Sequence, residues 1–84
     1  MTAPKLFVYV LRSLRYPMRY YIGLTSNVTQ RLSIHNSGGS SHTAQLRPWE
    51  LVASIEFAKA SSAVAFEKYL KSGSGRAFAK RHFV

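Results

Sequence analysis

Leu6-Phe7-Val8-Tyr9-Val10-Leu11 is the stretch that decides the fold, because every one of its side chains is apolar or aromatic. Successive side chains of a strand point to opposite faces of its sheet. A run with no polar position therefore predicts a strand that is covered on both faces. We expect residues 6–11 to form a central strand.

A second strand is expected at residues 19–24, which read Arg-Tyr-Tyr-Ile-Gly-Leu. The polar, proline-containing segment 13–18 separates the two strands, and this spacing is typical of a hairpin. A hairpin centred near residues 15 and 16 brings Tyr9 within about one residue of Tyr21 across the ladder. The two phenols are then expected to share one face of the sheet.

The next elements expected are a short helix and a loop. Thr25-Ser26-Asn27 supplies N-cap residues for a helix over Val28–Asn36, and segment 36–42, rich in glycine and serine, ends that helix. In this helix Val28, Leu32 and His35 recur at helical spacing.

Clean alternation over residues 49–57 then predicts a third strand with one wetter face, on which Glu50 and Glu56 lie. Ser61-Ser62 is expected to cap a second helix, which ends at Ser72-Gly73, and a last helix is expected over about Arg76–Phe83. The predicted order is strand, strand, helix, strand, helix, helix.

The charge balance points to a polyanionic partner. The 84 residues carry 12 Lys and Arg against 3 Asp and Glu, a formal charge of +9, in a chain that is 46% hydrophobic. Disorder at such a charge would require lower hydrophobicity, so the composition favours one folded domain, over residues 1–84, that binds nucleic acid. An anionic membrane surface or a merely solvated excess of lysine is the bland alternative.

Several classes of protein are excluded or disfavoured. The chain has no cysteine, which rules out disulfides and thiolate metal sites. Its longest apolar run has six residues, far short of the roughly 20 that span a bilayer. The sequence contains no recognisable export signal, and we expect a cytoplasmic protein without a membrane partner.

The few carboxylates narrow the search for a metal ligand. Glu50 and Glu56 are expected to be exposed or paired with arginines. Glu67 is placed at the rim of the apolar stripe of its helix, formed by Ala63, Phe66 and Leu70, and should be partly buried. An ion pair with Lys71 or Lys68 is the ordinary explanation, while a role as the one protein ligand of Mg²⁺ is the functional alternative.

The basic and aromatic side chains suggest a phosphate site. Arg31 and His35 are four residues apart on the predicted helix and project from one face. Arginine binds phosphate oxygens in pairs, and histidine exchanges protons near neutral pH. Packing is the ordinary role of Tyr9 and Tyr21, but cationic surroundings would lower a phenol pKa toward the range useful for a base.

In this order and spacing, the residues resemble the GIY-YIG nuclease superfamily, in particular its small single-domain members related to the catalytic domain of the bacterial excision-repair incision subunit. Phe7-Val8-Tyr9 takes the place of the first motif and Tyr21-Ile22-Gly23 matches the second. Arg31 and His35-Asn36 follow in register, and Glu67 corresponds to the metal-binding glutamate. Phe7 and Val8 replace the glycine and isoleucine of the first motif.

The resemblance implies an α+β fold, with a three-stranded antiparallel sheet flanked by helices, and metal-dependent hydrolysis of DNA. Tyr9 would act as general base with Tyr21 and His35 orienting the water, Arg31 would stabilise the phosphorane, and Glu67 would hold one Mg²⁺ or Mn²⁺. The residues expected to contact nucleic acid are Gly23, Asn36, Lys68, Lys71 and Arg76.

Two other functions stay open on the sequence alone. The first is a nucleic-acid binding module that keeps the fold but cleaves weakly or not at all. The second, weaker alternative is a basic RNA-associated protein. A domain of this length also leaves target choice to a separate part, so a protein partner that supplies specificity, for example in DNA repair, is expected.

Overall fold

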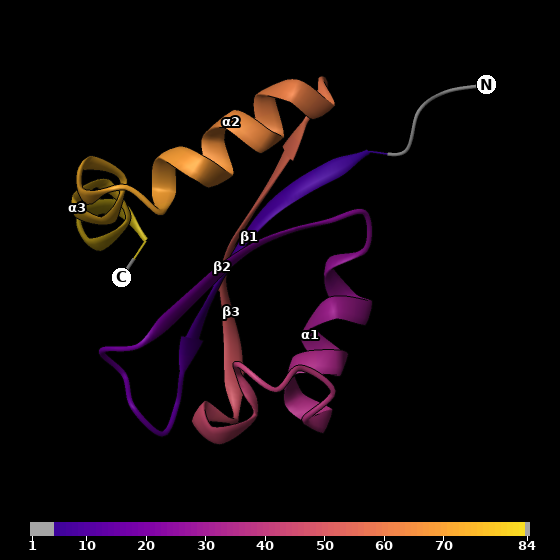
Figure 1. Ribbon diagram of the computed structural model, residues 1–84, viewed down its shortest axis with the longest axis vertical. Helices are drawn as coiled ribbons and strands as arrows, with labels where there is room; N and C mark the ends of the chain where they lie inside the picture. The colour runs from indigo at the N-terminus through magenta and orange to yellow at the C-terminus, as the bar shows by residue number, and fades with distance from the viewer. Residues whose placement is uncertain (1–4, 84) are drawn as a thin grey trace.

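A computed structural model describes residues 5–83. The elements follow the predicted order, with a short 3₁₀ turn inserted before the third strand (Figure 1). They are β1 (Leu6–Ser13), β2 (Tyr20–Thr25), α1 (Val28–Ser37), η1 (Ala44–Leu46), β3 (Trp49–Phe57), α2 (Ala60–Leu70) and α3 (Gly73–His82). The strands form one antiparallel sheet in the order β2-β1-β3, which confirms the predicted α+β class and the central position of the first strand.

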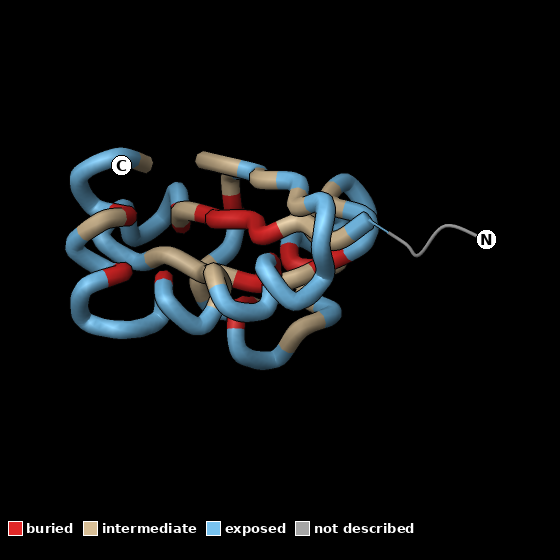
Figure 2. Tube along the Cα trace, turned by 90° about the horizontal axis from the view of Figure 1, so that it is seen from above, coloured by how far each residue is buried: buried red, intermediate tan, exposed pale blue. Residues whose placement is uncertain are grey.

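Side chains of β1 alternate between two cores, one on each face of the sheet. Val8 and Val10 pack with residues of α2 and α3, namely Ala63, Leu70 and Ala79. Tyr9 and Leu11 point to the other face and pack with Trp49 and part of α1. Buried residues accordingly follow the middle of the fold in Figure 2.

The register of the hairpin differs from the prediction by two residues. Tyr9 lies opposite Gly23, and Tyr21 lies opposite Leu11. Because the offset is even, both phenols still lie on one face, as predicted, and their ring centroids are 6.0 Å apart. The hairpin is centred on Tyr16, at the upper end of the predicted position.

A bulge in β3 overturns the prediction that Glu50 and Glu56 share a face. The register shifts so that Val10 pairs with Ala53 but Leu11 pairs with Leu51. Residues beyond the shift therefore exchange faces. Glu50 lies beside Arg12, with which it forms an ion pair, whereas Glu56 pairs across the ladder with Phe7 on the opposite face.

Two helix starts also differ from the prediction. Helix α2 begins after Lys59, without a side-chain cap, so Ser61 and Ser62 lie inside its first turn. Helix α3 begins three residues before the expected Arg76, because the Ser72 hydroxyl accepts a hydrogen bond from the Gly75 N–H. Within residues 5–83, no helix has the length and apolarity needed to cross a membrane.

Candidate active site

A buried hydrogen-bonded chain links β1, α1 and the segment before η1. The Tyr9 hydroxyl lies 2.9 Å from His35 Nε2, and His35 Nδ1 lies 2.8 Å from Thr43 Oγ1. Thr43 also donates to the Ser40 carbonyl oxygen at 3.4 Å. This network assigns the imidazole proton to Nδ1 and leaves Nε2 to accept the Tyr9 proton.

Burial sets the proton affinities of this chain. Tyr9 is 1% exposed and His35 is fully buried. Burial raises the pKa of Tyr9, with a smaller contribution from Tyr21, and outweighs the opposing effect of Arg31. The expectation that cationic surroundings lower this phenol's pKa is therefore wrong. Burial, reinforced by the charge of Arg31, lowers the pKa of His35 and favours a neutral imidazole.

Arg31 lies one helical turn before His35 and contributes the positive charge of the site. Its interaction with the Tyr9 hydroxyl raises the pKa of the guanidinium, so the side chain stays charged. Its Nε atom is buried and has no hydrogen-bond partner among the described residues. Tyr21 completes the group, with its ring centroid 4.6 Å from that of His35.

Gly23 makes room for the Tyr9 phenol. A Cβ atom on Gly23 would lie 2.6 Å from the Tyr9 hydroxyl oxygen and 2.7 Å from Cζ. The phenol thus occupies the space that any other residue would fill with its side chain. Gly23, which was predicted to contact nucleic acid, has this structural role as well.

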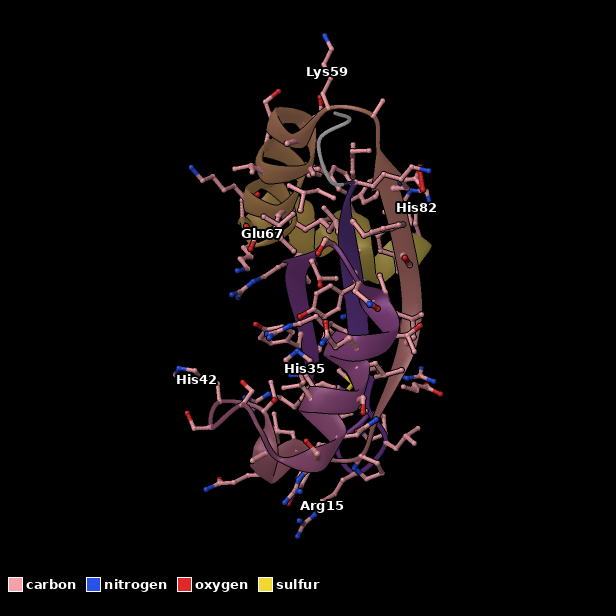
Figure 3. All side chains as sticks on the ribbon, turned by 90° about the vertical axis from the view of Figure 1, so that its right-hand side faces the viewer. Arg15, His35, His42, Lys59, Glu67 and His82 are labelled. Atoms are coloured by element: carbon pink, nitrogen blue, oxygen red, sulfur yellow. The ribbon has the colours of Figure 1, made fainter. Side chains whose placement is uncertain are left out.

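Glu67 reaches the same edge of the sheet from the other side. Figure 3 shows Glu67 and His35 on the side of the molecule where β2 forms the sheet edge. The Glu67 side chain is 15% exposed and its Oε2 atom lies 2.6 Å from Lys71 Nζ, so the predicted partial burial and ion pair are confirmed.

These positions also test whether the site suits a metal. Residues 5–83 contain no group of three or more His, Asp or Glu side chains that could hold an ion. A single, partly buried carboxylate suits Mg²⁺, which commonly takes one or two protein carboxylates and completes its shell with water and phosphate.

Comparison with known proteins agrees with this arrangement. The family model for the GIY-YIG catalytic domain matches residues 5–81. The chain belongs to the GIY-YIG family.

Three GIY-YIG comparisons are informative. A structure-specific endonuclease subunit SLX1 of Podospora anserina is 46% identical over 66 residues, 71% of this chain and 19% of that protein. A UPF0213 protein of Streptococcus pneumoniae is 42% identical over 53 residues, 62% of this chain and 54% of that protein. The solution structure of a UPF0213 protein from Bacillus halodurans superposes with a TM-score of 0.56 and 29% identity, over 92% of this chain and 81% of that one. The chain spans about a fifth of the length of the SLX1 relatives.

The other predicted site residues lie around this GIY-YIG centre with different partners. Asn36 binds both backbone groups of Trp49, accepting from its N–H at 2.6 Å and donating to its carbonyl at 3.0 Å, and so anchors the start of β3. Lys68 and Arg76 are exposed, and Lys71 is exposed but paired with Glu67.

Sequence reasoning missed Thr43. It is 1% exposed, and its carbonyl accepts a hydrogen bond from the Trp49 indole N–H at 3.0 Å. A lone threonine inside a glycine- and serine-rich segment carries no pattern that would reveal this position. Only the tertiary contact with His35 gives it a role.

Proposed function

We propose that this GIY-YIG domain is a divalent-metal-dependent endonuclease that hydrolyses phosphodiester bonds in DNA. The observation that carries the proposal is the buried chain from Tyr9 through His35 to Thr43, with the charged Arg31 beside the phenol. Packing alone accounts for a tyrosine on β1, but it does not account for a phenol hydrogen-bonded to a neutral, buried imidazole.

Tyr9 serves as the general base in this proposal, and His35 makes that possible. A phenol whose pKa is raised by burial is a poor base on its own. Neutral His35 can accept the phenol proton at Nε2 while Thr43 holds the ring through Nδ1. The pair can thus take a proton from water without exposing a phenolate in the ground state. Tyr21, stacked near the imidazole, orients the group.

Arg31 stabilises the charge that develops on the phosphorane. Its guanidinium stays charged and can bind two phosphate oxygens at once. The unpartnered Nε gives it a donor that a bound phosphate could satisfy. Binding of phosphate would also draw the guanidinium from Tyr9 toward the substrate.

Glu67 would hold one Mg²⁺ or Mn²⁺ per active site. When bound, the ion supplies positive charge that steadies the leaving oxygen. Lys71 keeps the carboxylate charged and oriented in its absence. The exposed Lys68 and Arg76, with Lys71, provide positive charge on the surface near α2 and α3 for the DNA backbone.

The names of the relatives support two finer proposals. SLX1 proteins are described as subunits of a structure-specific endonuclease. We infer that this chain, too, acts on DNA of particular structure and depends on another protein part for target choice, as in repair. A cytoplasmic location stays a prediction.

A cleavage assay tests the proposal. Single-stranded, duplex and branched DNA and single-stranded RNA would be incubated with the protein in Mg²⁺ or in EDTA, with Glu67→Ala as the blank. Cleavage of DNA only in Mg²⁺, and only by the parent, is expected. Tight DNA binding without cleavage of any substrate would instead support the non-catalytic binding module, and preference for RNA would support an RNA-associated protein.

A further inference from the structure

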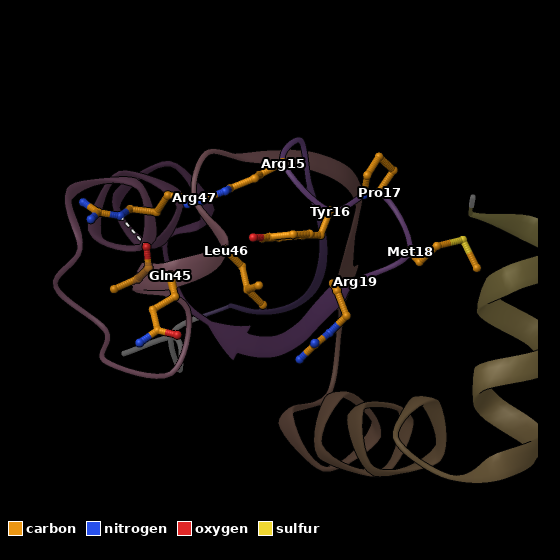
Figure 4. Close-up of a pocket in the computed structure, with 9 residues that line it drawn as sticks. Arg15, Tyr16, Pro17, Met18, Arg19, Gln45, Leu46 and Arg47 are labelled. Carbon is orange, nitrogen blue, oxygen red and sulfur yellow. Dashed lines mark hydrogen bonds between the residues drawn. The ribbon is translucent and has the colours of Figure 1, made fainter.

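A second site lies away from the catalytic group, at the tip of the hairpin. An open groove of about 870 Å³ runs between loop residues 15–19 and residues 44–47 of η1 and its C-terminal flank (Figure 4). Its volume lies within the range of about 300–1,000 Å³ typical of ligand sites. Figure 3 shows Arg15, which lines it, at the end of the molecule opposite Lys59.

The groove combines positive charge with an aromatic ring. Arg15, Arg19 and Arg47 line it, and no acidic residue does. Tyr16 is 45% exposed, and Figure 4 shows its ring pointing into the groove with Arg15 on one side and Arg19 on the other. The Arg15 guanidinium lies 5.3 Å from the centre of the Tyr16 ring. Positive charge beside a stacking surface suits unpaired nucleotides.

Hydrogen bonds hold the two walls of the groove together. The buried Ser13 hydroxyl donates to the Leu46 carbonyl at 2.6 Å and accepts from the Tyr16 N–H at 2.9 Å. The Leu14 N–H donates to the Pro48 carbonyl at 2.8 Å. The groove is therefore formed in the free protein, which reduces the entropy lost when a flexible strand binds.

The groove is also continuous with the active site. Thr43, which holds His35, immediately precedes η1, and Leu46 packs against the core around Tyr9 while lining the groove. In Figure 3, His35 lies between Glu67 and Arg15 along the molecule. A strand cut at Tyr9 could therefore continue into the groove.

We infer that the groove binds an unpaired stretch of the DNA strand adjoining the cleavage site, with phosphates on the three arginines and a base stacked on Tyr16. The choice of DNA rests on the proposed function. Bases of a duplex have no free face for the ring, so the groove distinguishes unpaired from paired DNA. It thereby gives the domain a built-in preference for substrates with a single-stranded arm.

Fluorescence anisotropy of the full chain in EDTA tests the inference without cleavage. The probes are labelled oligothymidylate and a blunt duplex of the same length. Tyr16→Ala should weaken oligothymidylate binding by roughly 5- to 150-fold and duplex binding by less than about twofold, whereas Tyr16→Phe should bind like the parent. Tyr69→Ala is the matched control, because Tyr69 is similarly exposed, at 41%, but lies on α2 outside the groove.

A second pair of variants tests the charge. Arg47→Gln should weaken oligothymidylate binding more than Lys59→Gln, which removes the same charge at the far end of the molecule. Equal loss in both, or parental single-strand binding by a folded Tyr16→Ala protein, would overturn the inference. Cleavage of the parent's substrates separates it from the proposed function: if no DNA is cut yet single-strand binding depends on Tyr16, only the nuclease proposal fails.

Discussion

Replacing Gly23 with alanine tests whether the position of the Tyr9 phenol controls the activity. The added Cβ would lie 2.6 Å from the hydroxyl oxygen, about 0.8 Å inside the 3.4 Å at which ordinary contact begins. The ring must move by about that amount, which disrupts a hydrogen bond to His35 that is 2.9 Å long. We expect overpacking to cost about 1–3 kcal/mol of unfolding free energy and misplacement of the base to cost on the order of 10²-fold in kcat.

Urea denaturation measures the first effect, and cleavage at saturating DNA measures the second. Gly73→Ala is the matched control, because a Cβ there meets nothing within 4 Å. It should leave the activity unchanged and the stability equal or slightly higher. In a Tyr9→Phe background, Gly23→Ala should add little further loss of rate, since the hydroxyl it displaces is already absent. Parental stability and parental rate in Gly23→Ala would refute this account of the glycine.

Four further predictions concern the proposed chemistry. Tyr9→Phe should lower kcat by roughly 10²–10⁴-fold with little change in DNA affinity, and Tyr21→Phe should cost less; a parental rate for Tyr9→Phe across the pH range would exclude it as the base. Glu67→Ala should abolish metal-dependent cleavage while DNA binding, measured by anisotropy, persists; full activity would contradict the one-metal proposal. His35 has a pKa below its unfolded value near 6.5, so unfolded chains bind more protons and urea stability should fall as pH drops below about 6.5, a slope that His35→Gln should reduce. DNA affinity should decrease linearly with salt on log-log axes, and a flat response would argue against backbone contacts.

The sequence predicted the parts of the fold that depend on local pattern. The uninterrupted apolar run of residues 6–11 specified a central strand, and Asn27 was correctly placed among the N-cap residues of α1, where its side chain accepts from the Gln30 N–H. The helix over Val28–Asn36 is one residue shorter than the observed α1. Such features are encoded by periodicity and by capping residues, which a single chain displays directly.

Features that depend on long-range contacts could not be predicted. The bulge near Val52 interrupts an alternation that looks continuous in sequence, because bulges are set by strand pairing. The pKa of Tyr9 depends on how deeply the ring is buried, which no charge count reveals. The association of Arg31 and His35 was correctly predicted from their spacing, but the threonine that holds the imidazole lies eight residues further along.

The bulge in β3 also bears on how this protein avoids self-association. β3 is an edge strand of nine residues, and a long, regular edge is a template for pairing with a strand of another molecule. The shift at Val52 breaks that regularity and sends Glu50 and Glu56 to opposite faces, so an incoming strand would meet both an irregular ladder and a carboxylate on either side. A chain that must keep a basic surface free for its partner is thereby hindered from polymerising through its own sheet.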